Sequence, residues 1–78
     1  MVEISGEIDL ASAPELRDGL ISLVAAGRAE IVVDGSGVEF IDASGINVLL
    51  DAADAARRAG GHLRLSRPSP SFRRLLDL

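Results

Sequence analysis

The feature that most constrains this chain is the alternation of strand patterns with helix patterns along its 78 residues. Three segments have the apolar alternation or the short apolar run of a strand: residues 2–8, 30–33 and 62–66. Three others have the helical spacing of apolar side chains: residues 12–26, 43–59 and 70–77. Strands that are joined by helices are normally parallel and connected by right-handed crossovers. We therefore predict an α/β domain with a mainly parallel sheet of about three strands, in the order 1-2-3, and crossover helices packed on one face.

The first predicted helix, residues 12–26, has residues typical of a helix start at one end and of a helix stop at the other. Ser12 and Glu15 have the spacing of a capping box, in which the serine side chain caps the helix. Pro14 lies in the first turn, where its missing N–H costs nothing, and Gly27 can adopt the left-handed backbone that ends a helix. The inward face of this helix is predicted to consist of Leu16, Leu20, Leu23 and Val24.

A turn pattern follows the second strand and a helix start follows the turn. Asp34 opens the cluster DGSG, which we expect to end the strand, and residues 38–41 form a further extended stretch. Asp42 is a suitable N-cap for the second helix, which Gly60 and Gly61 end. The apolar stripe of this helix is predicted to be Ile46, Leu49, Leu50, Ala53 and Ala56. The inward side chains of the third helix are predicted to be Phe72, Leu75 and Leu76.

Composition excludes several classes of function. The chain has no cysteine and one histidine, which excludes disulfides, thiolate zinc sites, cysteine nucleophiles and multi-histidine metal sites. Its formal net charge of −4 argues against nucleic acid as a partner, because phosphate binding needs a cationic face. No run of about 18 apolar residues or more is present, and the first residues do not resemble a signal peptide. We therefore expect a cytoplasmic protein without a membrane partner.

Three carboxylates and one serine are predicted at the carboxyl ends of the strands, where open parallel sheets place their sites. Asp9, Asp34 and Asp42 could hold Mg²⁺ as in a receiver-like phosphoacceptor, or could simply shape turns and cap a helix. A nucleophile pair of Ser44 and His62 fails, because a helix of about 16 residues separates them by roughly 24 Å. Ser44 could instead accept phosphate from another protein, because it lies unobstructed in a first helical turn.

The longest distinctive string of the chain is residues 33–46, VDGSGVEFIDASGI. Three further segments accompany it: the opening strand and helix, residues 4–16, and the later residues 60–65 and 72–76. In order and spacing these four segments resemble STAS domains, and more narrowly the bacterial anti-sigma factor antagonists. The resemblance implies one STAS-like domain over residues 1–78.

The resemblance also implies a function. In that family an anti-sigma factor serine kinase phosphorylates the serine before the glycine, which is Ser44 here. The unphosphorylated antagonist binds the anti-sigma factor and frees the sigma factor, and a serine phosphatase reverses the modification. Many members have serine or threonine at the position of Ala43, so Ser44 is the remaining candidate.

The expected partner-binding residues are Asp9, Asp34, Asp42, Ala43, Ser44, Gly45 and Ile46. No cofactor, metal or enzymatic activity is implied. The alternative is a STAS domain of another system, such as a stress-signalling scaffold or a transporter-associated subunit.

Family members commonly have a further strand before the one that opens this chain, and a further helix and strand after its end. We therefore expect the first strand to form an uncovered edge of the sheet, which invites pairing with another copy. Glu3 and Glu7 oppose such pairing in an antiparallel dimer. An edge-paired or segment-swapped homodimer at high concentration, favoured by salt, is the resulting expectation.

Overall fold

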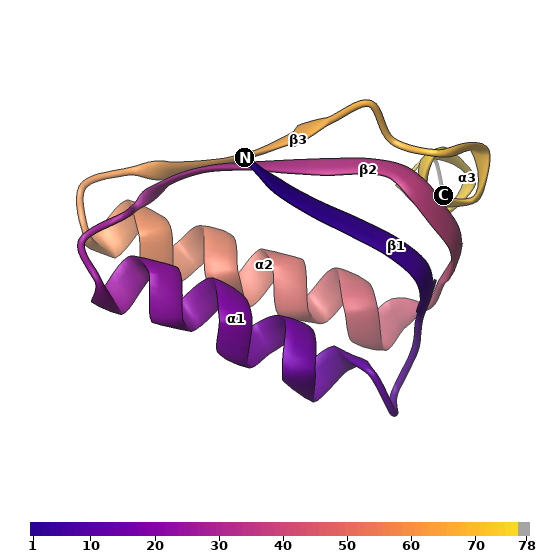
Figure 1. Ribbon diagram of the computed structural model, residues 1–78, viewed down its shortest axis with the longest axis horizontal. Coiled ribbons are helices and arrows are strands. Elements are labelled where there is room, and N and C mark those ends of the chain that lie inside the picture. Colours follow the sequence, from indigo (N-terminus) through magenta and orange to yellow (C-terminus); the bar gives the residue numbers. More distant parts are fainter. Residues whose placement is uncertain (77–78) are drawn as a thin grey trace.

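The computed structural model describes residues 1–76 (Figure 1). Its elements are β1 (Val2–Ile8), α1 (Ala13–Ala25), β2 (Glu30–Ile41), α2 (Ala43–Arg58), β3 (His62–Ser66) and α3 (Pro70–Leu76). The three strands form one parallel sheet in the order β1-β2-β3. Helices α1 and α2 lie side by side on one face of this sheet, and α3 lies at the carboxyl end of β2 (Figure 1). The predicted fold class, strand order and single-sided helix layer are confirmed.

The central strand is longer than predicted, and the predicted turn at residues 34–37 is wrong. These residues continue β2, where Asp34 pairs with both Glu3 and Ser66. The pairing with β1 shifts register twice, and each time β2 has one more residue than its partner. Such bulges let an irregular segment remain within a sheet. Pairing on both sides therefore overrides the local turn tendency of the DGSG cluster.

The core lies between the sheet and the two helices. Its largest fully buried side chains are Leu20 of α1, Val33 of β2 and Phe72 of α3. The buried face of α2 is rotated from the predicted stripe, because Gly45, Val48 and Leu49 face the core and Leu50 is 62% exposed. The further buried residues of this helix are Ala52 and Ala56. Helix α2 packs against both the sheet and α1, so its buried surface is broader than one stripe.

The first helix begins differently from the predicted capping box. Ser12 makes no side-chain cap, because its backbone is already helical and its hydroxyl donates to the carbonyl oxygen of Glu7 at 3.0 Å. The carboxylate of Asp9 accepts the N–H groups of Ala11 and Ser12 instead, at 3.0 and 3.1 Å. At the other end Gly27 has a φ of 83°, as predicted for a left-handed stop.

The third helix packs its aromatic side chain inward and leaves its end exposed. Phe72 is fully buried and Leu75 is half-buried, but Leu76 is exposed, so the prediction for Leu76 is wrong. Residue 77, predicted as the last of this helix, lies outside the described residues. No helix within residues 1–76 has the length and apolar character needed to cross a membrane.

Candidate functional site at the start of helix α2

The first turn of α2 is fixed by the side chain of Asp42. Its carboxylate accepts the N–H of Ser44 at 2.9 Å and that of Gly45 at 3.3 Å, which satisfies two donors that would otherwise lack helical partners. The N–H of Asp42 donates to the carbonyl oxygen of Ile8 at 3.2 Å, so the start of α2 is also tied to the end of β1. The predicted N-cap is confirmed.

Close packing of Gly45 sets the position of this turn against the sheet. A Cβ atom on Gly45 would lie 2.7 Å from Cγ2 of Ile8 and 2.8 Å from Cγ1 of Ile41. Only glycine allows the backbone of α2 to approach these two side chains so closely. Gly45 is buried and therefore positions its neighbours, which corrects the expectation that it contacts a partner itself.

The residues around Gly45 differ in exposure. Ala43 is exposed, whereas Asp42, Ser44 and Ile46 are half-buried. Ser44 donates its backbone N–H to Asp42, and its hydroxyl makes no hydrogen bond with any other part of the described chain. The backbone at Ser44 is thus fixed by Asp42, while its side chain is held by no hydrogen bond within residues 1–76. An anion on it would lie at a helix N-terminus, which favours negative charge.

The loop after β1 lies beside this turn, because Ile8 and Ile41 are paired in the sheet and each is followed by an aspartate. In that loop the N–H of Ser12, its hydroxyl and the N–H of Ala11 donate to Asp9 and hold the pKa of its carboxyl below its usual value. Asp9 and Asp42 thus each cap a turn at the same end of the sheet, as expected from the sequence.

Asp34 does not belong to this site, contrary to the prediction. Asp34 is 2% exposed and lies within β2, where the N–H of Ser36 donates to its carboxylate at 2.9 Å. It also forms an ion pair with Arg67, whose backbone is left-handed with a φ of 49°. The N–H of Ser36, followed by the guanidinium of Arg67, lowers the pKa of Asp34 to about 2. Asp34 therefore fastens the segment after β3 to the sheet.

The predicted metal and nucleophile alternatives gain no geometric support. Asp9, Asp34 and Asp42 are each occupied by separate N–H groups, and no group of three acidic or histidine side chains suited to a metal occurs in residues 1–76. His62 lies beyond the far end of α2, where its Nδ1 is 3.5 Å from Oε1 of Glu30. It is a surface strand residue.

Two exposed apolar side chains at this end of the sheet were missed from the sequence. Leu10 follows Asp9 and is 76% exposed, and Phe40 precedes Ile41 and is 49% exposed. Regular strand alternation would place Phe40 on the same face as the buried Val38. The register shift between these two residues turns Phe40 away from the core and Ile41 toward it, and the sequence does not indicate this shift.

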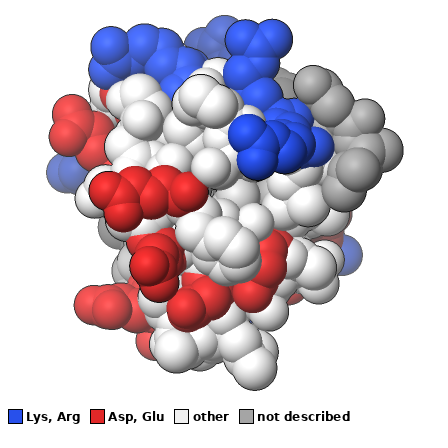
Figure 2. All heavy atoms as spheres, turned by 90° about the vertical axis from the view of Figure 1, so that its right-hand side faces the viewer, with Lys and Arg blue, Asp and Glu red and all other residues white. Residues whose placement is uncertain are grey.

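Charge is divided across the face that carries the start of α2. Figure 2 shows this face, with acidic side chains gathered over its lower half and arginines over its upper half, toward α3. The acidic residues at the carboxyl ends of β1 and β2 are Glu7, Asp9, Glu39 and Asp42. The arginines between the end of β3 and the end of α3 are Arg67, Arg73 and Arg74. A partner that covers the start of α2 therefore meets both charges.

The structure combines a small parallel sheet, two helices on one face and a capped helix start at the carboxyl end of the sheet, and a known domain family matches the chain that forms it. The chain belongs to the STAS domain family, because the family model described as Mlab, STAS domain, matches residues 1–78.

Relatives and solved structures are consistent with this family. The chain is 35% identical over 77 residues to the anti-sigma-B factor antagonist of Bacillus subtilis, which is 99% of this chain and 70% of that protein. An anti-sigma factor antagonist from Mycobacterium paratuberculosis has a similar structure, with a TM-score of 0.83, 29% identity and coverage of 96% of this chain and 63% of that one. The antagonist SpoIIAA in its unphosphorylated form has the same fold, with a TM-score of 0.79, 22% identity and coverage of 96% and 69%.

Proposed function

We propose that this protein is an anti-sigma factor antagonist whose binding to an anti-sigma factor is switched by phosphate on Ser44. The anti-sigma factor is itself a serine kinase, and it transfers the γ-phosphoryl group of ATP to the hydroxyl oxygen of Ser44. The unphosphorylated protein binds this partner and releases the sigma factor for transcription. A serine phosphatase removes the phosphate. The protein acts in the cytoplasm, as a regulatory binding protein and not as an enzyme.

One observation carries this proposal. Ser44 is half-buried and its hydroxyl has no hydrogen-bond partner among residues 1–76, while the backbone N–H of the same residue donates to Asp42. A kinase can therefore engage the hydroxyl oxygen without first breaking an intramolecular hydrogen bond, on a turn whose backbone is already positioned. The relationship to the Bacillus subtilis antagonist, at 35% identity, supports the assignment of the partner class.

The partner contacts the end of the sheet around Ser44. Ala43, Ser44 and Ile46 present the first turn of α2, and Asp42 and Asp9 flank it. The exposed side chains of Leu10 and Phe40 at the same end supply apolar surface for this interface. Gly45 supports the surface from beneath, and Asp34 has no direct part in it.

Phosphate on Ser44 acts at the interface and leaves the fold intact. It gains about 0.3–1 kcal/mol from the N-terminus of α2. Repulsion from the nearby carboxylate of Asp42 opposes this gain and costs about 1–6 kcal/mol at about 6 Å, for effective dielectric constants from about 80 to about 20 and before screening by salt, so the start of α2 adjusts locally. Against a partner surface without a matched cation, desolvation of the dianion costs far more. Loss of binding therefore does not require unfolding.

Incubation with candidate anti-sigma factor kinases and ATP, followed by mass mapping of the phosphate, tests the proposal. We expect one phosphate, on Ser44, and none on a Ser44→Ala variant. Ser36→Ala is the matched control, because Ser36 stands in the same D-x-S-G pattern and is exposed. Modification of Ser36, or unchanged modification of the Ser44→Ala variant, contradicts the proposal.

A further inference from the structure

The connection between β1 and α1, residues 9–12, presents a leucine to solvent at a corner of the molecule (Figure 1). Leu10 is 76% exposed, which is more than any other large apolar side chain of residues 2–76. A single exposed leucine is ordinary on a protein surface, so its meaning depends on how the chain holds it and on what surrounds it.

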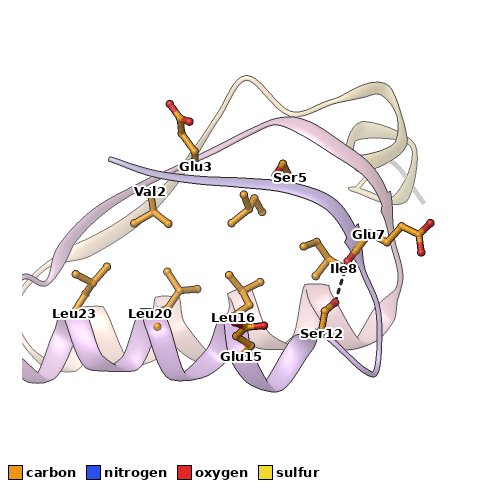
Figure 3. Close-up of a pocket in the computed structure, with 12 residues that line it drawn as sticks. Val2, Glu3, Ser5, Glu7, Ile8, Ser12, Glu15, Leu16, Leu20 and Leu23 are labelled. Atoms are coloured by element: carbon orange, nitrogen blue, oxygen red, sulfur yellow. Dashed lines mark hydrogen bonds between the residues drawn. The ribbon is translucent and has the colours of Figure 1, made fainter.

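Hydrogen bonds hold this connection in one conformation. The hydroxyl of Ser12 accepts the N–H of Asp9 at 2.9 Å and donates to the carbonyl oxygen of Glu7 at 3.0 Å, a bond that Figure 3 shows between the start of α1 and the end of β1. The carboxylate of Asp9 accepts the N–H groups of Ala11 and Ser12. Leu10 is therefore the projecting side chain of a loop whose residues on both sides are fixed.

A loop that is already ordered lowers the cost of binding. Ordering a mobile segment at an interface costs free energy, and a segment that is fixed in the free protein avoids most of this cost. Burial of the apolar surface of a leucine in a recess is favourable. Leu10 thus combines a large apolar area that is still exposed with a position that is defined before a partner arrives, and both properties are typical of an interface anchor.

The same loop is joined to the first turn of α2. Ile8 ends β1, and its carbonyl oxygen accepts the N–H of Asp42 at 3.2 Å. Ile8 also pairs with Ile41 in the sheet, so the loop that carries Leu10 and the turn that carries Ser44 start from paired positions. A partner that covers Ser44 from the carboxyl end of the sheet therefore also meets the loop of Leu10.

Charge decides what kind of molecule covers Leu10. Glu7, Asp9 and Asp42 are acidic, and Figure 2 shows acidic side chains gathered over the lower half of this face. A second copy that packed its own Leu10 against this one would bring its carboxylates against these, and like charges across an interface cost free energy. The occupant is therefore a different protein, with an apolar recess and a cationic rim.

We propose that Leu10 is the anchor by which the anti-sigma factor holds this protein, and that its side chain inserts into an apolar recess of that partner. This inference rests on the proposed function, which supplies the partner, and adds the residue that provides most of the affinity. Ser12 is a positioning residue, because its hydroxyl bonds to both Glu7 and Asp9 and so fixes the loop. Leu10 sets the affinity, and phosphate on Ser44 switches it.

Surface plasmon resonance with the anti-sigma factor kinase that modifies Ser44 tests the inference. Leu10→Ala should weaken binding about tenfold or more, mainly through faster dissociation. Leu50→Ala is the matched control and should leave binding unchanged, because Leu50 is also an exposed leucine but lies further along α2, beside β3. Thermal unfolding of both variants should match the wild type, because exposed side chains contribute little to the fold.

The kinase reaction gives an independent measure of the same contact. Leu10→Ala should raise the KM for this protein about tenfold and leave kcat unchanged, because Leu10 binds equally in the ground state and the transition state. A fall in kcat with an unchanged KM overturns the role of Leu10 as an anchor.

Ser12→Ala tests whether the loop positions the anchor. It should weaken binding in the otherwise wild-type protein and have no further effect in the Leu10→Ala variant, because Ser12 acts through Leu10. Equal weakening by Ser12→Ala in both backgrounds overturns the positioning role.

The outcomes separate this inference from the proposed function. A wild type whose binding is switched by phosphate on Ser44, together with unchanged affinity of the Leu10→Ala variant, overturns the inference and leaves the proposed function standing. Equal weakening by Leu50→Ala overturns the inference as well. A wild type that no anti-sigma factor binds overturns both.

Discussion

The pattern D-x-S-G occurs twice in this chain, and the two copies begin with the same local structure. In each, the aspartate carboxylate accepts the N–H of the serine two residues later at 2.9 Å, Asp34 from Ser36 and Asp42 from Ser44. Their surroundings then diverge. The first copy continues a central strand, with its aspartate buried against Arg67, and the second starts a helix.

The difference shows what a short pattern decides and what it does not. Contact between aspartate and serine is local and follows from the spacing alone. Whether the serine is presented at a helix start depends on the residues that follow and on partners far along the chain. Arg67 and Phe72 lie more than thirty residues beyond Asp34, yet they cover Asp34 and Gly35, the first two residues of that copy. The second copy has no such cover among the described residues.

The largest expected effect comes from removing the cover of the first copy. Phe72 is fully buried and lies over Gly35, where a Cβ atom would be 2.9 Å from Cδ2 of the ring. Phe72→Ala should lower the free energy of unfolding by about 3–5 kcal/mol, because it leaves a cavity in a small core. Phe40→Ala is the control, since Phe40 is half-exposed, and it should cost far less. Urea denaturation measures both. Equal losses of unfolding free energy in the Phe72→Ala and Phe40→Ala variants would show that Phe72 is not what distinguishes the first copy of the pattern.

The final glycine of each copy gives the next effect. Gly45→Ala should cost about 1–3 kcal/mol of unfolding free energy, because the new methyl group would overlap Ile8 and Ile41. Gly37→Ala should cost less, since its nearest contact would be Cβ of Ser5 at 3.0 Å at an exposed position. Gly19→Ala is the control and should stabilise the protein, because it adds a methyl group to an open helical position. A Gly45→Ala variant as stable as the wild type contradicts the close approach of α2.

Removal of the helix cap tests the second copy alone. Asp42→Ala should lower the free energy of unfolding by about 0.5–2 kcal/mol, because two N–H groups lose their acceptor. Asp42→Asn should restore most of this stability, since asparagine caps nearly as well. Amide hydrogen exchange at Ser44 and Gly45 measures the same cap locally. Unchanged exchange in the Asp42→Ala variant would show that the cap does not hold this turn.

Asp34, the buried aspartate of the first copy, should make the free energy of unfolding fall at acidic pH. Its pKa is about 2 in the folded protein, against about 3.9 for an unperturbed aspartate. A lowered folded pKa contributes stability above the unfolded value, and this contribution is lost as the pH falls from about 4 to about 2. In an Asp34→Asn variant, unfolding free energy should change less across that window than in the wild type. If the free energy of unfolding falls equally with pH in the wild type and the Asp34→Asn variant, the ion pair between Asp34 and Arg67 does not stabilise the fold.

The smallest effects are expected at the two serines. Ser44→Ala and Ser36→Ala should each change the free energy of unfolding by less than about 0.5 kcal/mol, because both keep the N–H that the aspartate accepts. Thermal unfolding of the two variants beside the wild type checks this. A larger loss for Ser44→Ala would mean that its hydroxyl has a structural role and would complicate any binding comparison.

Much of the fold could be predicted because its determinants are local. The caps of α2 and the stop at Gly27 depend on neighbouring residues, and the parallel strand order follows from helical connections. The length of β2 could not be predicted, because pairing with β1 and β3 on both sides keeps the DGSG cluster extended. The buried face of α2 was misjudged because Gly45, a residue without an apolar side chain, fixes the rotation of the helix.

The candidate site divides in the same way. Asp42 and Ser44 could be placed from sequence, because an N-cap and the residue two positions later form one local unit. Asp34 was wrongly grouped with them because nothing in its neighbourhood indicates that Arg67 pairs with it. Leu10 and Phe40 were missed because their exposure depends on strand register and loop path.

The most direct test of the central claim, that phosphate on Ser44 controls partner binding, is a calorimetric titration of the anti-sigma factor. The titrants are the unphosphorylated protein, the protein phosphorylated on Ser44, and the Ser44→Ala, Ser44→Asp and Ser36→Ala variants. We predict equally tight binding of the unphosphorylated protein, Ser44→Ala and Ser36→Ala, weaker binding of Ser44→Asp, and no detectable binding of the phosphorylated protein. Equal affinity of the phosphorylated and unphosphorylated proteins would contradict the account.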